Sequence, residues 1–271
     1  MSKDGDTLEN DQVETITAMS TSDVAANDGE VWRPWPTFWL GLGIGVTSFF
    51  VQVIVVAFFA IVRIASNPRQ DVLVLSESLS KNGLLLIVSG IASELVVIGL
   101  VLLVIRLRKG WTISEYLAFR PISSKVLLAA LIAISALVAV SDGITHLSGR
   151  PIVPQFEIDL YRSGVSPLLA WILLIVTAPI TEEIVFRGFL LEGFRRSRMG
   201  NIGAVVVTAI MWGSLHLQYD IYNVGIIVAT GLLLGAVRLK SRSLWPCIAM
   251  HSLMNLIATV ELVVHMRSIG G

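Results

Sequence analysis

Six polar residues that lie within apolar stretches could together carry out hydrolysis. They are Glu182, Glu183, Arg187, His216, His251 and Asn255. A charged side chain in lipid is costly, so each charged residue here needs a partner or a function. A carboxylate can take a proton from water while imidazole and amide groups stabilise an oxyanion. This chemistry requires no serine or cysteine nucleophile.

The spacing of the first three residues separates the tasks of the two glutamates. Glu183 and Arg187 are four residues apart, so on a helix they share a face and can neutralise each other. Glu182 lies about 100° around the helix, and its neighbour four residues on is Phe186. We therefore expect Glu182 to be free to activate water and Arg187 to be the structural partner of Glu183.

The histidines allow a second route that uses a metal. His251 and Asn255 are four residues apart on one face, and His216 comes from another apolar stretch. Two imidazoles and one carboxylate can bind zinc and leave a position for water, which makes Glu182, His216 and His251 the candidate ligands. The residue pattern leaves both the zinc-dependent and the metal-independent route open.

These residues are set in a chain that is 54% hydrophobic and only 15% charged, whereas about a quarter of the residues in a soluble domain are charged. A bilayer is spanned by roughly 20 apolar residues, and in lipid such runs must be helical. The runs cover residues 37–64, 83–105, 124–141, 167–192, 201–217, 221–239 and 244–265. The sequence predicts an all-α transmembrane bundle of about seven spans.

Composition also divides the chain. Residues 1–34 are acidic and lack apolar periodicity, which predicts a disordered tail. Residues 35–145 are expected to form N-terminal transmembrane helices, and residues 165–265 a catalytic transmembrane core. Lysines and arginines between alternate spans predict a multi-pass protein with a cytoplasmic N-terminus.

Charge and cysteine content restrict the partners. The net charge is zero, so no bulk field favours nucleic acid. The single cysteine, Cys247, excludes a disulfide framework within one chain. The expected partners are membrane lipid and a membrane-associated protein or peptide substrate. The sequence indicates no oligomeric state.

The polar blocks resemble the CPBP family, also called the Abi family, of CAAX prenyl endopeptidases and bacteriocin-processing and bacteriocin-immunity proteins. The family pattern is Glu-Glu-xxx-Arg, then an aromatic residue four positions before a histidine, then His-xxx-Asn. The matching residues are Glu182, Glu183 and Arg187, then Trp212 with His216, then His251 with Asn255. Trp212 replaces the commoner phenylalanine. Residues 115–121 also resemble a segment that precedes the core in many bacterial members.

The resemblance implies an intramembrane endopeptidase of the CAAX-protease type in a bacterial plasma membrane. Glu182 would activate water with the help of Glu183 and His216. His251 and Asn255 would stabilise the oxyanion or help to hold a metal. A prenylated CAAX protein is one substrate that the resemblance suggests, and a peptide precursor or a membrane regulator is another.

Two other functions use the same residues differently. In a non-catalytic immunity or scaffold protein, the polar cluster would bind a partner helix or stabilise the bundle. In a proton-coupled transporter, intramembrane glutamates and histidines would form a proton relay. The sequence lacks the internal repeat that many secondary transporters have, which argues against transport.

Overall fold

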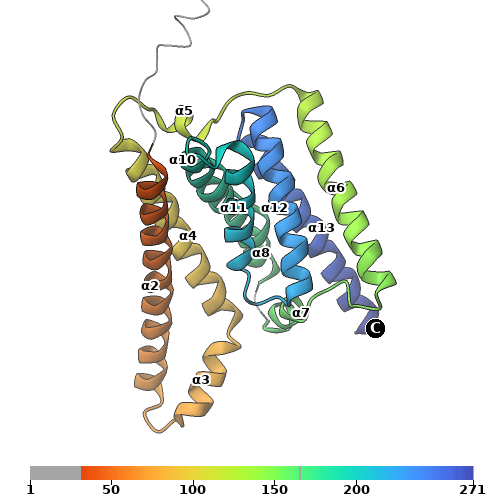
Figure 1. Cartoon of the computed structure of the whole chain (residues 1–271). Coiled ribbons are helices and arrows are strands. Elements are labelled where there is room, and N and C mark those ends of the chain that lie inside the picture. The colour runs from red at the N-terminus through yellow and green to blue at the C-terminus, as the bar shows by residue number, and fades with distance from the viewer. Residues whose placement is uncertain (1–31, 165, 271) are drawn as a thin grey trace, which may run out of the picture.

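The computed structural model describes residues 32–164 and 166–270, and every regular element in these ranges is a helix (Figure 1). The all-α prediction is therefore confirmed for this part of the chain. The acidic tail expected over residues 1–34 lies, up to residue 31, outside the described residues.

Among the described residues, six helical stretches are long and apolar enough to cross a membrane. They are α2 (Pro34–Ser66), α4 (Gly83–Arg106), α6 (Ser124–Leu147), the stretch Pro167–Arg195, α12 (Ile221–Ser241) and α13 (Trp245–Ile269). The remaining predicted run forms α11 (Gly200–Ser214), whose 15 residues rise only about 22 Å. Six long helices and one short one agree with the expected seven, and the chain is an integral multi-pass membrane protein.

Three short helices fall between the spans, where the sequence offered no long apolar run. They are α3 (Val72–Ser80), α5 (Ile113–Leu117) and α7 (Gln155–Arg162). Capping residues fix the starts of two of them: the Asp71 carboxylate accepts from the Leu73 amide, and Thr112 forms a reciprocal capping box with Glu115.

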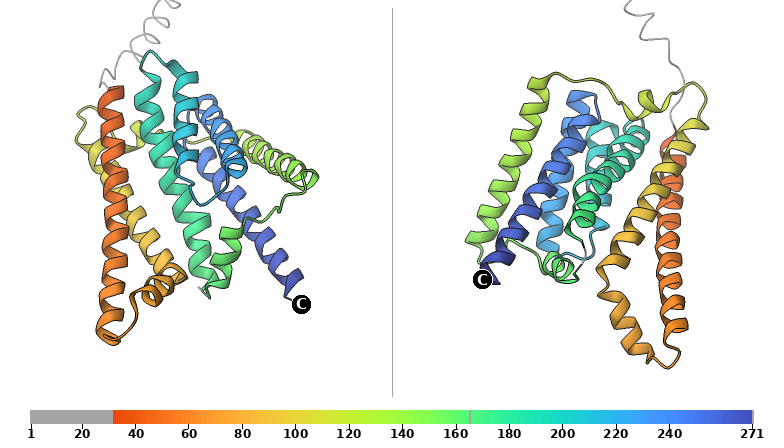
Figure 2. Two further views of the ribbon diagram at one scale, coloured as in Figure 1. Left: turned by 60° about the horizontal axis from the view of Figure 1, so that its bottom comes forward. Right: turned by 180° about the vertical axis from the view of Figure 1, so that it is seen from behind.

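The helices form a bundle with two flanks (Figures 1 and 2). On one flank, α2 and α4 pack against each other as a hairpin joined through α3. On the other flank, α6 packs against α13. The Pro167–Arg195 stretch, α11, α12 and α13 lie between the flanks, so the predicted catalytic residues come from the middle of the bundle.

The Pro167–Arg195 stretch alternates between α-helical and π-helical turns. Its segments in order are α8 (Pro167–Trp171), η1 (Ile172–Thr177), α9 (Ala178–Glu183), η2 (Ile184–Leu190) and α10 (Leu191–Arg195). Single π-helical turns inside α-helices occur frequently at functional sites. The glutamate pair ends the α-helical turn that the two π-helical segments enclose.

Glycines on α12 allow it to approach α11 closely. A Cβ atom at Gly231 would lie 2.9 Å from the Ala209 Cβ, and one at Gly235 would lie 2.8 Å from Val205 Cγ1. Small residues four positions apart let membrane helices pack this tightly. The close packing fixes α11, which carries Trp212 near its C-terminal end.

We predict that Gly235→Leu destabilises the bundle, because the side chain would overlap Val205 in a tightly packed interface. Overpacking of this kind costs roughly 1–3 kcal/mol. Thermal unfolding of the purified protein in detergent measures the effect. Gly225→Leu is the matched control, since it lies on the same helix and a Cβ there meets no atom within 4 Å. Equal shifts for both variants would contradict the packing explanation.

Candidate active site

Glu183 and Arg187 form an ion pair at the centre of the site, as their spacing predicted. Arg187 Nη1 lies 2.9 Å from Glu183 Oε1, and both side chains are 0% exposed. Arg187 Nη2 also donates to the Gly231 carbonyl at 3.3 Å, and its guanidinium lies 4.5 Å from the centroid of the Trp212 ring. A buried pair loses solvation, and these further contacts partly offset that loss.

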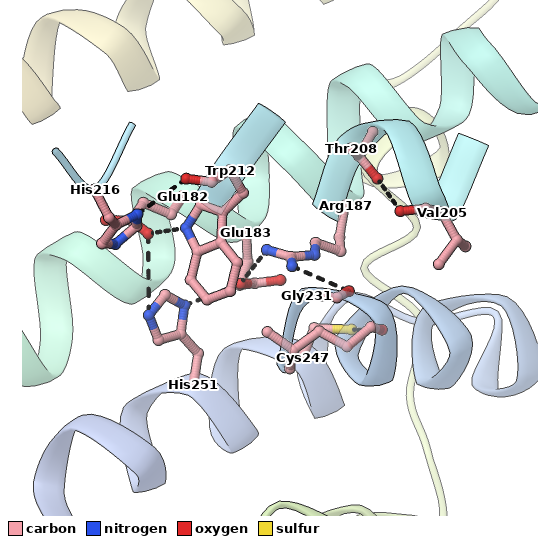
Figure 3. Close-up of polar contacts among 11 residues, drawn as sticks. Glu182, Glu183, Arg187, Val205, Thr208, Trp212, His216, Gly231, Cys247 and His251 are labelled. Atoms are coloured by element: carbon pink, nitrogen blue, oxygen red, sulfur yellow. Dashed lines mark hydrogen bonds and ion pairs between the residues drawn. The ribbon is translucent and has the colours of Figure 1, made fainter. Parts of the chain in front are cut away.

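His251 is held by the same carboxylate. Its Nδ1 lies 2.9 Å from Glu183 Oε1, and the side chain is only 3% exposed. A carboxylate paired with an arginine can only accept hydrogen bonds, so Nδ1 carries the proton in this contact. In the neutral imidazole Nε2 is then the acceptor nitrogen, and it lies 4.0 Å from Glu182 Oε2 (Figure 3).

Glu182 has a different environment from its neighbour. Its side chain is 30% exposed, and its Oε2 accepts a hydrogen bond from the indole Nε1 of Trp212 (Figure 3). Arg187 pairs with Glu183 and not with Glu182, as helix geometry predicted. The structure thus places one glutamate inside an ion-pair core and the other at an accessible surface.

His216 lies just beyond the end of α11, where it contacts Trp212 twice. Its Nδ1 is 2.9 Å from the Trp212 carbonyl, an acceptor, so Nδ1 donates and Nε2 is left as the basic nitrogen. The two rings meet edge-on, with centroids 5.3 Å apart, and the His216 ring also stacks on Tyr219.

Asn255 connects α13 to the π-helical turn before the glutamates. The Ala178 amide bonds to the Leu173 carbonyl, five residues back. The next donor in that pattern would come from Pro179, which has no N–H. The Leu174 carbonyl instead accepts from Asn255 Nδ2 at 2.7 Å. Because Pro179 has no N–H, the Leu174 carbonyl lacks the backbone donor of the π-helical pattern, and the Asn255 side chain binds it instead.

A cavity of about 290 Å³ brings four of the predicted residues to one surface. The four are Glu182, His216, His251 and Asn255. Glu183 and Arg187 are fully buried and do not line this cavity, so the structure separates a cavity surface from a supporting pair. The roles assigned to these residues from the sequence stay predictions.

The cavity continues to a wall formed by α6 and α7, which sequence reasoning missed. Glu157 of α7 lines it, and the Tyr219 hydroxyl donates to Glu157 Oε1 at 3.3 Å. Burial raises the pKa of Glu157 to about 7, although the Tyr219 hydrogen bond acts in the opposite direction. Glu157 belongs to no motif. The sequence feature that points to it is its hydrogen-bond partner Tyr219, which follows His216 by three residues.

A catalytic zinc ion needs about three protein ligands that converge on one point. Glu182 and His251 approach each other, with 4.0 Å between Oε2 and Nε2. Within residues 32–164 and 166–270, however, no group of three or more histidine, cysteine, aspartate or glutamate side chains is arranged to hold a metal ion. The side-chain positions described here therefore do not fit a three-ligand zinc site.

Comparison with known proteins agrees with the resemblance drawn from the three polar blocks. Residues 164–257 match the family model described as type II CAAX prenyl endopeptidase Rce1-like. The match includes Glu182, His216, His251 and Asn255, and it supports a membrane endopeptidase at the level of the family. No curated protein and no solved structure matches the chain.

We predict that Arg187→Met strongly destabilises the protein, because it leaves the Glu183 carboxylate buried without its cation. Removing one partner of a buried pair costs about 3–5 kcal/mol. Thermal unfolding in detergent reports the loss, and adding Glu183→Gln to Arg187→Met should recover part of it. Lys81→Met is the control, since it breaks an exposed pair with Glu77 of the same spacing and should change little.

Proposed function

We propose that this chain, which contains an Rce1-like CAAX prenyl endopeptidase domain, hydrolyses a peptide bond of a membrane-associated protein or peptide with Glu182 as the base. One observation supports the proposal above all: the Glu182 carboxylate lines a cavity together with two histidines whose Nδ1 atoms are already bound. The family match supplies the reaction class.

The proposed reaction uses a water molecule and the side chains of this chain, with no metal step. Glu182 takes a proton from a water molecule, and the resulting hydroxide attacks the carbonyl carbon of the scissile bond. His251 Nε2 accepts the second water hydrogen and orients the nucleophile. The tetrahedral intermediate collapses with cleavage of the C–N bond, and Glu182 returns its proton to the amine that leaves.

Stabilisation of the oxyanion falls to Asn255 in this scheme. As neutral imidazoles that donate through Nδ1, both histidines present an Nε2 that accepts hydrogen bonds and does not donate them. Asn255 Nδ2 has two hydrogens, and one of them is used on the Leu174 carbonyl. Its second hydrogen can donate to the developing negative charge, which is the role the family resemblance implies.

The cavity wall suits an apolar part of a substrate. Besides the polar residues, its lining includes Leu137, Leu174, Ile227, Met254 and Leu262. A prenyl group or an apolar peptide segment would bury surface against this wall, with a gain of about 25 cal/mol per Å². We propose such a lipidated or apolar chain as the substrate class.

We predict that Glu182→Ala lowers peptide cleavage by at least about a hundredfold, because general-base catalysis contributes that much or more. Prenylated CAAX peptides and an apolar peptide library, assayed with detergent-purified protein by mass spectrometry, provide the measurement. Glu77→Ala on the exposed helix α3 is the control. Undiminished cleavage by a folded Glu182→Ala variant would contradict the proposal. If no variant cleaves any peptide, yet all restore a deletion phenotype, the scaffold function is favoured instead.

Zinc dependence is tested separately. Because the described side chains supply no three-ligand group, the proposed mechanism has no metal step, and cleavage should survive prolonged treatment with a strong chelator. The measurement is the cleavage activity before and after chelation, together with the metal content of the same samples. It shows whether cleavage depends on zinc. Loss of activity that zinc restores would show that Glu182, His216 and His251 rearrange into a metal site.

A further inference from the structure

The Trp212 side chain contacts four charged or imidazole groups at the centre of the site. Its indole N–H donates to Glu182 Oε2, and its ring faces the Arg187 guanidinium at 4.5 Å (Figure 3). The His251 and His216 rings meet it edge-on, with centroids 5.2 Å and 5.3 Å away. No motif assigns Trp212 more than aromatic bulk, whereas the structure also gives it a polar contact.

The indole ring is buried, and the backbone of Trp212 is held by further contacts. Trp212 is 1% exposed, and its carbonyl accepts hydrogen bonds from the Leu215 amide and from His216 Nδ1. The next residue, Gly213, faces α12 so closely that a Cβ atom would lie 2.5 Å from Val228 Cγ2. The part of α11 that carries Trp212 is therefore restrained by its packing against α12.

Glu182, in contrast, has few restraints of its own. Its side chain is partly exposed to the cavity, and its distance of 4.0 Å to His251 Nε2 is too long for a hydrogen bond. Among the described residues, Trp212 is the hydrogen-bond donor to this carboxylate. Without it, rotation about the side-chain bonds would move both oxygens relative to a water molecule and a substrate carbonyl.

We propose that Trp212 is a positioning residue whose indole N–H, and not merely its bulk, aims Glu182. The N–H holds Oε2 and leaves Oε1 as the oxygen that takes the proton from water. This inference rests on the proposed hydrolytic function, because it specifies how the base of that reaction is oriented. The contact itself, however, can be measured without any cleavage.

The first test observes the hydrogen bond directly. The chain has seven tryptophans, so the ¹⁵N-labelled protein in detergent should give seven indole N–H resonances, and Trp212→Phe identifies one by its disappearance. In Glu182→Ala this resonance should move upfield, as expected when an indole loses a carboxylate acceptor. Glu77→Ala should leave it in place. An unchanged Trp212 resonance in Glu182→Ala would falsify the proposal, whatever the enzyme activity.

The second test separates the N–H from the bulk of the ring. Benzothienylalanine, incorporated at position 212 of the full chain by codon suppression, keeps the bicyclic shape and replaces N–H with sulfur. We expect kcat to fall about ten- to a hundredfold, as for the loss of one hydrogen bond to a charged group. KM should change by no more than about twofold, because Trp212 orients the base and does not bind the substrate.

Controls distinguish positioning from damage to the fold. The same replacement at Trp245, which is half exposed and packs on Phe119, should leave kcat unchanged. Thermal unfolding of the position-212 protein should stay near that of the wild type. If its kcat is also wild-type, the N–H has no positioning role. If the resonance shift is found but wild-type protein cleaves nothing, the hydrolytic function fails while the contact stands.

Discussion

The buried pair of Glu183 and Arg187 determines how the rest of the site can be arranged. A charge pair with no exposure must satisfy its remaining donors and acceptors from protein groups. The Gly231 carbonyl, the Trp212 ring and His251 Nδ1 meet part of that need, and they come from α12, α11 and α13. Glu183 Oε2 and Arg187 Nε have no hydrogen-bond partner among the described residues. Three helices are thereby brought to the helix that carries the glutamates, and the orientation of His251 follows from the same contact.

Glu182 can face the cavity because Glu183, the next residue of the helix, is buried in the ion pair. Adjacent residues on a helix point about 100° apart, so burial of Glu183 in the ion pair turns Glu182 toward the cavity. One carboxylate then lies in the ion pair and the other faces the cavity. The same sequence of two glutamates thus yields two chemically distinct groups without any difference in residue type.

Features that depend on local spacing could be predicted from the sequence. The apolar runs identified six long helices and the short α11, and the four-residue spacing identified the partner of Glu183. Features that depend on three-dimensional packing could not. The π-helical turn before the glutamates depends on the N–H that Pro179 lacks and on the contact that Asn255 makes from α13. The Trp212 hydrogen bond depends on how α11 meets the glutamate helix, and neither residue's spacing specifies that contact.

The cavity joins two parts of the chain that differ in their relation to the family. Its end with Glu182, His216 and His251 lies within residues 164–257, which match the CAAX endopeptidase model, while its far wall comes from α6 and α7, which precede that segment. Substitutions in α6 or α7 can therefore alter the shape and charge of this wall while Glu182 and the residues that contact it stay the same. The two walls of one cavity can thus vary in sequence independently of each other, because only one of them carries the residues of the family pattern.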